Sequence, residues 1–169
     1  SMPDSLRPRK KKTAVITQDP LVANLASSFG CHTLAEPAGS GLDRAITAGV
    51  TFATQNGASH CLILPSDLPF LQADELAEFV TVKETAAPHP TIVLSSDRQQ
   101  QGTNGLIAPM GLEFRLQYGR NSFQYHQQEA ARLGLPCHIV DLPGLQFDLD
   151  TEQDFALYTK SSPAVTPSG

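Results

Sequence analysis

Short apolar runs alternate with helical patterns along most of this chain of 169 residues, and this alternation limits the folds that it can adopt. The clearest run, residues 60–64, reads His-Cys-Leu-Ile-Leu, and a continuous apolar run of this length predicts a strand buried on both faces, as in a parallel sheet. Further strands are expected at residues 13–17, 31–34, 91–94, 104–108, 137–140 and 145–149, and helices at 20–29, 42–55, 72–82, 121–133 and 154–159. Strands that alternate with helices predict an α/β fold, with helices on both faces of a mostly parallel sheet.

The bulk properties narrow the class of protein further. A composition of 40% hydrophobic and 17% charged residues is typical of a globular domain. The net charge of −5 argues against a nucleic-acid-binding surface, and no apolar stretch approaches the roughly 20 residues of a membrane span. We interpret residues 1–12 as a tag and basic tail, 13–160 as a single domain, and the Ser/Pro-rich residues 161–169 as a disordered tail.

The cysteines indicate a reducing compartment. Cys31, Cys61 and Cys137 are odd in number and widely spaced, which predicts reduced thiols in a cytoplasmic protein. Each adjoins a histidine, but neighbouring residues on a strand face opposite ways, and the chain has no Cys-x-x-Cys pair. A zinc site is therefore disfavoured.

Two carboxylates stand at the end of the expected strand 145–149. Side chains two apart on a strand share a face, so Asp148 and Asp150 would lie side by side, and their repulsion would raise a pKa unless a cation lay between them. Thr151, with Asp154 three residues on, predicts the start of a helix. The pattern fits a divalent-cation site or an ordinary solvated acidic turn.

A third carboxylate, Asp67, follows the run 60–64 and is held between Pro65 and Pro69, which stiffen the turn. Ligands of open α/β sheets collect beyond the carboxyl ends of the strands. We therefore predict that Asp67, Asp148 and Asp150 are catalytic and bind Mg²⁺, which favours a few carboxylates plus substrate phosphates. Alone, Asp67 is equally compatible with a turn residue.

Two loops could hold an anion. Gly119-Arg120-Asn121-Ser122 precedes a predicted helix, whose N-terminus would attract carboxylate or phosphate, while Arg120 would add a forked donor. Asn121 or Ser122 would cap this helix, and a well-capped surface helix would give the same pattern. The polar loop 96–104 lies between two strands and could hold a ligand or simply cross through solvent. The Gly39-Ser40-Gly41 loop is only a weak match to a dinucleotide fingerprint, because it lacks the third glycine.

Four segments occur in an order and spacing that resemble one family: 64–69, 97–104, 118–126 and 148–154. The chain, from about residue 13 to 158, resembles the CofC/FbiD family of phospholactate or phosphoenolpyruvate guanylyltransferases. The resemblance implies a nucleotide-diphospho-sugar transferase-like (glycosyltransferase A-like) three-layer sandwich. It also implies transfer of GMP from GTP to phosphoenolpyruvate, 2-phospho-L-lactate or 3-phosphoglycerate, with release of pyrophosphate, on the route to the deazaflavin coenzyme F-420.

The resemblance also assigns roles to residues. It implies that Asp67, Asp148 and Asp150 hold Mg²⁺. Contacts to the carboxylate and phosphate of the acid would come largely from backbone N–H groups of Thr103, Gly119 and Ser122, and from the same two loops we add Arg120 and Asn104 to the substrate-binding set. We interpret His126 as a helix-face residue without a catalytic role, because the substrate phosphate is already an anionic nucleophile and needs no general base.

The chain departs from the family pattern in three places. Residues 13–17 would correspond to the family's second strand, so the first strand-helix unit and its nucleotide-phosphate loop do not have a counterpart here. Either this unit lies outside this sequence or the domain lacks it, and in the second case GTP binding is in doubt. Asp43 stands where the family has asparagine, and residues 99–101 replace a stretch that usually contains glycine. Another nucleotidyltransferase of this fold, of the molybdopterin or sugar-phosphate type, or a non-catalytic binding module, would fit the same motifs. We expect GTP and a phosphorylated acid as partners, without nucleic acid or membrane, and the oligomeric state stays open between monomer and homodimer.

Overall fold

The computed structural model describes residues 12–36, 39, 41–86 and 89–161. The chain divides into two compact units, Ser1–Gly57 and Ala58–Gly169. The expected basic tail, apart from Lys12, and the expected C-terminal tail, apart from Ser161, lie outside the described residues, as does part of the Gly39–Gly41 loop. A single domain over residues 13–160 stays a prediction.

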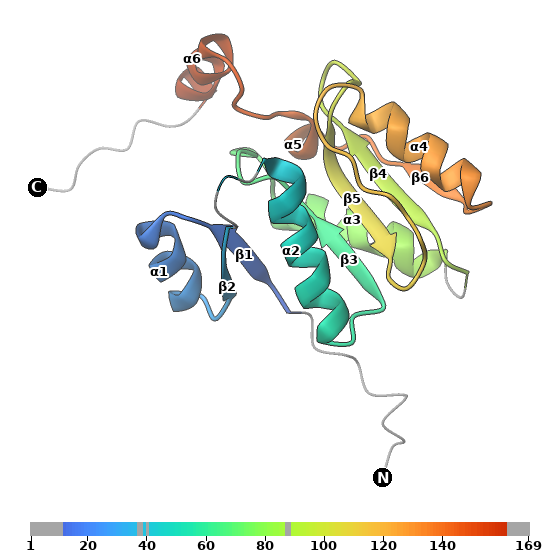
Figure 1. The fold of residues 1–169 in the computed structure, drawn as a ribbon. Coiled ribbons are helices and arrows are strands. Elements are labelled where there is room, and N and C mark those ends of the chain that lie inside the picture. Colours follow the sequence, from blue (N-terminus) through green and yellow to red (C-terminus); the bar gives the residue numbers. More distant parts are fainter. Residues whose placement is uncertain (1–11, 37–38, 40, 87–88, 162–169) are drawn as a thin grey trace, which may run out of the picture. The chain divides into compact units, whose positions relative to one another are not determined.

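The first unit is built around two parallel strands, β1 (Ala14–Thr17) and β2 (His32–Ala35). They are joined by α1 (Pro20–Ser28), which begins where the Asp19 carboxylate accepts a hydrogen bond from Leu21 N at 2.7 Å. The next helix, α2 (Leu42–Gln55), packs on β1, and a side chain at Gly49 would meet Ile16 at 3.1 Å. The expected elements of this region are confirmed (Figure 1).

The second unit contains a four-stranded sheet in the order β3-β5-β4-β6 (Figure 1). Its strands are β3 (His60–Ile63), β4 (Ile92–Ser96), β5 (Thr103–Pro109) and β6 (Cys137–Ile139). The β5 strand runs antiparallel to both β3 and β4, whereas β4 and β6 are parallel. Three of the four strands therefore run in one direction.

One expectation for β3 is wrong. The apolar run was expected to be fully buried in a parallel environment, but β3 is only half-buried and pairs antiparallel with β5. Its apolar character has a packing reason, because Leu62 packs against the cluster on one face of the sheet and Ile63 against the cluster on the other.

Helices cover both faces of this sheet. On one face, α3 (Ala73–Thr85) and the single turn α5 (Pro143–Gln146) pack around the fully buried Phe79 and Leu145. On the other, α4 (Ser122–Arg132) packs Phe123 and Ala130 against β4 and β5. Helix, sheet and helix form the expected three layers, and β4 at their centre is buried along its whole length.

The strand expected at residues 145–149 is wrong. The chain forms α5 there, and residues 147–150 have no regular secondary structure. Pro143 occupies the first turn of α5, and the Glu75 carboxylate of α3 accepts a hydrogen bond from Gly144 N at 2.8 Å. The apolar pattern therefore reflects a buried helical turn. The last helix, α6 (Glu152–Ser161), begins as predicted: Asp154 accepts a hydrogen bond from Thr151 N at 2.9 Å, and Thr151 Oγ1 accepts one from Asp154 N at 3.2 Å.

Within the described ranges, no helix combines the length and apolar character needed to cross a membrane. Cys31, Cys61 and Cys137 are all free thiols.

Candidate active site

The three carboxylates predicted to bind metal belong to two segments that the fold brings together. Asp67 follows β3, and its backbone carbonyl accepts a hydrogen bond from Leu149 N at 3.1 Å. This bond ties the irregular segment that carries Asp148 and Asp150 to the turn after β3. Asp148 and Asp150, on either side of Leu149, are therefore held near Asp67 by this bond and not by a strand, and the metal site stays a prediction.

The electrostatics show that these carboxylates interact. Burial raises the pKa of Asp148, the Asn104 side chain lowers it, and the charges of Asp150 and Asp97 raise it further. Burial also raises the pKa of Asp150, with the charge of Asp67 as the next cause. Carboxylates that repel one another in this way favour a cation or a proton in their midst.

The three carboxylates are hard oxygen donors of the type that Mg²⁺ prefers. In the described ranges, no group of three or more His, Cys, Asp or Glu side chains is close enough to form a ready-made metal site. One atom nevertheless suggests an incomplete site, because Asp67 Oδ1 is buried and has no hydrogen-bond partner within the part of the chain that the structure describes. A buried carboxylate oxygen without a donor is costly, and a hard cation would satisfy it. The residues present therefore fit Mg²⁺ in chemical type, and the ion itself stays a prediction.

Buried polar groups gather near the same edge. Besides Asp67, the side chains near this edge that have a buried oxygen or nitrogen without a hydrogen-bond partner among the described residues include Ser95, Ser96, Asn104 and Ser122. They lie at the carboxyl end of β4, the start of β5 and the start of α4, and each is 5% exposed or less. Because buried polar atoms are normally paired, this group indicates a site for a polar ligand. Ser95 and Ser96 were not predicted as site residues.

Asp97 shapes the loop between β4 and β5. Its two carboxylate oxygens accept hydrogen bonds from Gln101 N at 2.9 Å and from Gly102 N at 2.7 Å. A side chain at Gly102 would lie 2.9 Å from Asp97 Oδ2, so a larger residue there would displace the Asp97 carboxylate. Phe123 N donates to the Gln101 carbonyl at 3.1 Å, which joins this loop to the start of α4. Hydrogen bonds therefore hold the polar loop together and join it to α4. Asp97 with Gly102 five residues later is the sequence signal that could have indicated such a loop.

The start of α4 partly matches its prediction. Asn121 is the N-cap residue, with φ +66°, but its side chain makes no capping hydrogen bond, and Gly119 has φ +106°. Ser122 N donates to the Gly119 carbonyl at 3.1 Å. The predicted substrate residues Gly119 and Ser122 are therefore adjacent, whereas Arg120 is exposed. The two left-handed residues bend the chain sharply into the helix.

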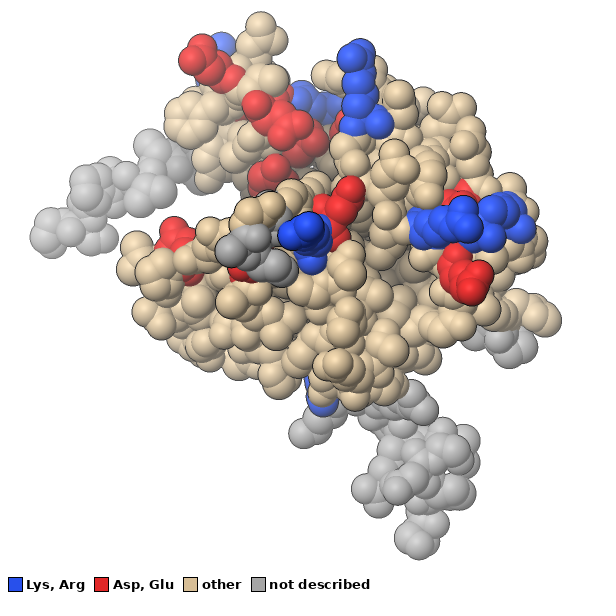
Figure 2. All heavy atoms as spheres, viewed as in Figure 1, with Lys and Arg blue, Asp and Glu red and all other residues tan. Residues whose placement is uncertain are grey.

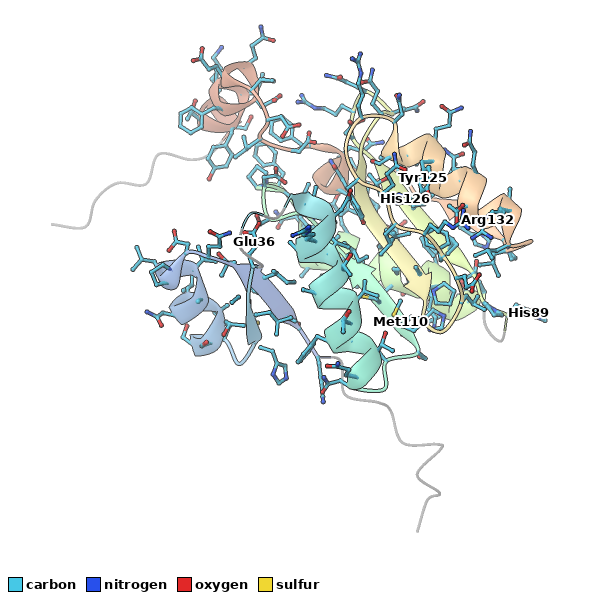
Figure 3. All side chains as sticks on the ribbon, in the orientation of Figure 1. Glu36, His89, Met110, Tyr125, His126 and Arg132 are labelled. Carbon is cyan, nitrogen blue, oxygen red and sulfur yellow. The ribbon has the colours of Figure 1, made fainter. Side chains whose placement is uncertain are left out.

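His126, interpreted as a helix-face residue, lies on α4 (Figure 3) and is fully buried on the face that also carries Phe123 and Ala130. Its Nδ1 lies 3.0 Å from Thr103 Oγ1. The spacing of three and four residues between these α4 positions is the signal that could have indicated burial. Thr103, a predicted substrate residue, thus contacts this histidine, a partnership that the sequence did not predict.

Arg98 connects the polar loop to α6. Its guanidinium pairs with Asp154 and lies 4.3 Å from the centre of the Phe147 ring. Arg98 N also donates to the Gln146 carbonyl at 3.1 Å. Arg98 therefore contacts residues before and after the segment that carries Asp148 and Asp150.

This connection predicts a pH-dependent stability. The Thr151 hydroxyl and the Arg98 guanidinium hold the pKa of Asp154 below its usual range. A depressed folded-state pKa stabilises the protein above the ordinary aspartate pKa, and this stabilisation is lost as the pH falls through the depressed value. Asp154→Asn should therefore lower the melting temperature at neutral pH, and calorimetry at decreasing pH should show the gap to wild type closing. Thr151→Val should give a smaller gap with the same direction, and a gap independent of pH would contradict the assignment.

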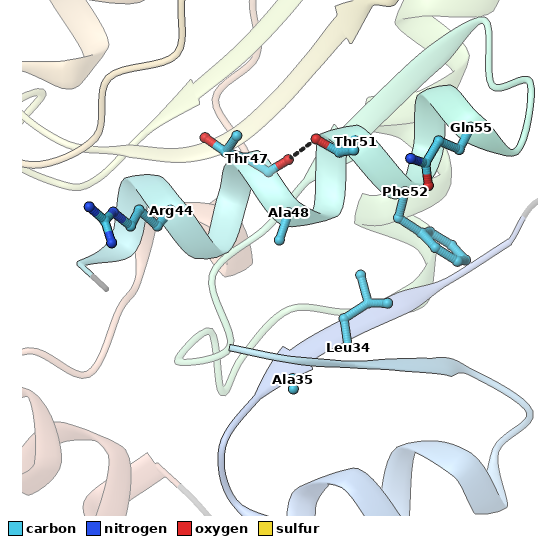
Figure 4. A pocket seen from close by; sticks show the side chains of 8 residues that line it. All are labelled: Leu34, Ala35, Arg44, Thr47, Ala48, Thr51, Phe52 and Gln55. Atoms are coloured by element: carbon cyan, nitrogen blue, oxygen red, sulfur yellow. Dashed lines mark hydrogen bonds between the residues drawn. The ribbon is translucent and has the colours of Figure 1, made fainter. Parts of the chain in front are cut away.

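A separate pocket lies within the first unit, between β2 and α2 (Figure 4). It has a volume of about 530 Å³ and is lined by Leu34, Ala35, Arg44, Thr47, Ala48, Thr51, Phe52 and Gln55. Its two threonine hydroxyls already donate to helix carbonyls, Thr51 to Thr47 at 2.8 Å and Thr47 to Asp43 at 2.7 Å. None of the predicted site residues lines it. Charged side chains form only small groups on the face seen in Figure 2, where neither sign covers a broad area.

The comparison with known protein families supports the motifs. The family described as "Guanylyl transferase CofC like" matches residues 4–158. A phosphoenolpyruvate guanylyltransferase of Rubrobacter xylanophilus is 34% identical over 148 residues, which cover 86% of this chain and 69% of the relative. A 3-phospho-D-glycerate guanylyltransferase of Phenylobacterium zucineum is 28% identical over 145 residues, which cover 85% of this chain and 65% of the relative. The chain thus spans about two thirds of the length of these curated relatives.

The solved structures agree on the fold. A provisionally named nucleotide-diphospho-sugar transferase from Desulfovibrio desulfuricans G20 matches with a TM-score of 0.62 and 12% sequence identity, over 91% of this chain and 68% of that protein. At this identity the likeness concerns the fold, and it confirms the nucleotide-diphospho-sugar transferase-like α/β architecture. With the family match over residues 4–158, the chain belongs to the CofC-like guanylyltransferase family.

Proposed function

We propose that this chain transfers GMP from GTP to the phosphate of a small three-carbon acid and releases pyrophosphate. The observation that carries the proposal is the family match over residues 4–158. The names of the relatives point to phosphoenolpyruvate or 3-phospho-D-glycerate as acceptor, and 2-phospho-L-lactate is a third candidate of the same chemistry. The product would serve as a precursor of coenzyme F-420.

The protein does not need to form a covalent intermediate or to supply a general base for this reaction. The acceptor phosphate is already an anion, so it can attack the α-phosphorus of GTP in line without a general base, and pyrophosphate leaves. The protein must bring two polyanions together and hold them in this geometry. Asp67, Asp148 and Asp150 would hold Mg²⁺, which would supply the positive charge that offsets the two phosphates.

The acid would bind beside these carboxylates. Thr103 and Asn104 at the start of β5, Gly119 and Ser122 at the start of α4, and the exposed Arg120 supply donors, and the Asn104 side chain also interacts with the Asp148 carboxylate. Hydroxyls and amides that are buried and unpaired are suited to a carboxylate and a phosphate, because such anions accept several hydrogen bonds. Arg120 is exposed, so its side chain is free to rotate toward an anion bound at this site.

We place the reaction in the cytoplasm. Its substrates are soluble phosphates, and the three free thiols fit a reducing compartment. GTP and the acid are the proposed partners.

Pyrophosphate release tests the proposal. The purified chain is incubated with Mg²⁺ and one nucleotide, GTP, CTP, ATP or UTP, together with each of the three acids in turn. Release is expected with GTP and one of the acids, and only when both are present. A preference for CTP or ATP would favour another nucleotidyltransferase of this fold, and no release from a folded chain would favour a non-catalytic binding module.

A further inference from the structure

Aromatic side chains surround His126, which contacts the predicted substrate residue Thr103. Its ring lies 5.1 Å from Tyr118, 5.8 Å from Tyr125 and 5.9 Å from Phe114, measured between ring centroids. The residue is fully buried, so its nitrogens are served by protein groups. The proposed reaction does not use this histidine as an acid or a base, and its burial therefore needs another explanation.

The hydrogen bonds of His126 fix its tautomer. Gln117 N donates to His126 Nε2 at 3.3 Å, and a backbone N–H can only donate. His126 Nε2 is therefore the acceptor nitrogen, and in the neutral ring the proton lies on Nδ1. Nδ1 is 3.0 Å from Thr103 Oγ1, so the histidine donates to the threonine oxygen. The Thr103 hydroxyl proton is then directed to some other acceptor, which the described residues do not supply.

An irregularity in the sheet turns Thr103 toward this histidine. Regular alternation would place Thr103 on the same face as Gly105, where an added side chain would contact Phe79 of α3. The register between β4 and β5 instead shifts at Ser95/Ser96, so that Ser96 pairs with Thr103. A shift of this kind re-aims a side chain, and here it turns Thr103 to the α4 face, where His126 lies.

Two further residues with hydroxyl groups are neighbours of this contact in the strand register and along α4. Ser96 is the cross-strand neighbour of Thr103, and Ser122 lies one helical turn before His126 on α4. The hydroxyls of Ser96 and Ser122 are buried without a partner in the described part of the chain. A cluster of donors without internal acceptors has the character of a site for an anionic group.

We propose that His126 is a positioning residue that fixes Thr103 as a hydrogen-bond donor to the anionic acceptor substrate. The inference rests on the proposed function and deepens it, because it explains why this histidine is neutral, buried and held at both nitrogens. The Thr103 hydroxyl then donates a hydrogen bond to the carboxylate or phosphate of the acid. The binding of GTP does not depend on this bond.

The tautomer can be measured without turnover. Long-range ¹⁵N–¹H correlation spectra of the full chain at neutral pH, with His126 assigned by comparison with His126→Phe, should show a protonated Nδ1 and an unprotonated Nε2. A protonated Nε2 would overturn the proposal, because the Thr103 hydroxyl would then be consumed as the donor to Nδ1.

Substitutions separate the two hydrogen bonds of the histidine. The amide nitrogen of His126→Asn can take the place of Nδ1 and donate to Thr103, whereas the longer side chain of His126→Gln reaches the position of Nε2 and serves Gln117. We expect His126→Phe, His126→Gln and Thr103→Val to raise the KM for the acid about ten- to one hundred-fold, with the KM for GTP unchanged. His126→Asn should retain most of the affinity for the acid.

A matched control accounts for lost stability. Thr91 is a fully buried threonine directly before β4, at the end of the strand opposite Ser96, and its hydroxyl donates to the Pro136 carbonyl at 3.1 Å. Thr91→Val removes a comparable buried hydrogen bond and should lower the melting temperature without changing either KM. If the KM for the acid follows the melting temperature across all five variants, and not the presence of a donor to Thr103, the proposal is wrong.

The design distinguishes this inference from the proposed function. If the wild-type chain releases no pyrophosphate, the proposed function fails, and calorimetric titration with phosphoenolpyruvate and with 3-phosphoglycerate decides the inference. Binding to wild type that His126→Phe loses supports it. Equal binding by both chains, or binding by neither, overturns it.

Discussion

Replacement of both Asp148 and Asp150 by asparagine is expected to abolish pyrophosphate release and to leave the fold intact. Burial is the main cause of the raised pKa values of Asp148 and Asp150, and nearby carboxylate charges, Asp150 on Asp148 and Asp67 on Asp150, raise them further. Lysine and arginine are not among the causes of either shift. Such a group is suited to binding a cation, and its loss removes the charge that offsets two polyanionic substrates. We expect a loss of at least about a thousand-fold in kcat/KM, a scale typical of removing a charge-stabilising group from an active site.

The stability of this double variant provides the internal check. Carboxylates whose folded-state pKa is raised stabilise the fold only at low pH, and this contribution is lost as the pH rises through the raised value. The ionised pair is therefore unfavourable at neutral pH without a cation, and the double variant should melt at the same temperature as the wild type or higher. Mg²⁺ should raise the melting temperature of the wild type and not that of the variant. An active double variant, or one that Mg²⁺ stabilises as much as the wild type, would contradict the metal assignment.

The largest effect on stability is expected from Phe79→Ala. Phe79 is fully buried and joins α3 to the sheet through Val93 and Ile107. Its ring occupies the space that Gly105 leaves open, since a side chain at Gly105 would lie 3.0 Å from Phe79 Cζ. Truncation removes buried apolar surface and leaves a cavity, which together cost about 3–5 kcal/mol of unfolding free energy.

Urea unfolding measures this cost, and a second phenylalanine serves as its control. Phe155 on α6 is 60% exposed, so Phe155→Ala should change the free energy of unfolding by less than about 0.5 kcal/mol. Gly105 adjoins Asn104 in β5, so we also expect Phe79→Ala to weaken binding of the acid. A Phe79→Ala chain as stable as Phe155→Ala would show that this packing does not hold α3 on the sheet.

The sequence predicts most helices and strands, because apolar periodicity and terminal glycines mark them. The exception at residues 145–149 has a simple cause: a short apolar run is compatible with a strand or with one buried helical turn. The hydrogen bond from Gly144 N to Glu75 stabilises the helical turn, and it joins residues far apart in the chain, so the local sequence does not indicate it. The direction of β5 was equally hidden, since strand orientation depends on the path of the connecting loop.

In the candidate site, too, local sequence patterns indicate some features, and others depend on contacts between distant segments. The acidic segments were visible because Asp67, Asp148 and Asp150 follow apolar runs, and the fold brings them to one sheet edge. The partnership of Thr103 with His126 was not visible, because it depends on a register shift between two strands. A local sequence pattern can therefore indicate a charged ligand site but not the contacts that orient its donors.

The most direct test of the central claim is identification of the product. The intact chain is incubated with GTP, Mg²⁺ and phosphoenolpyruvate, or one of the other two acids, and the mixture is examined by mass spectrometry and ³¹P NMR. The account predicts a species with the mass of GMP joined to the acid through two linked phosphates, formed in step with pyrophosphate. GDP or GMP without the joined product, from a folded chain that consumes GTP, would show a hydrolase and contradict the account.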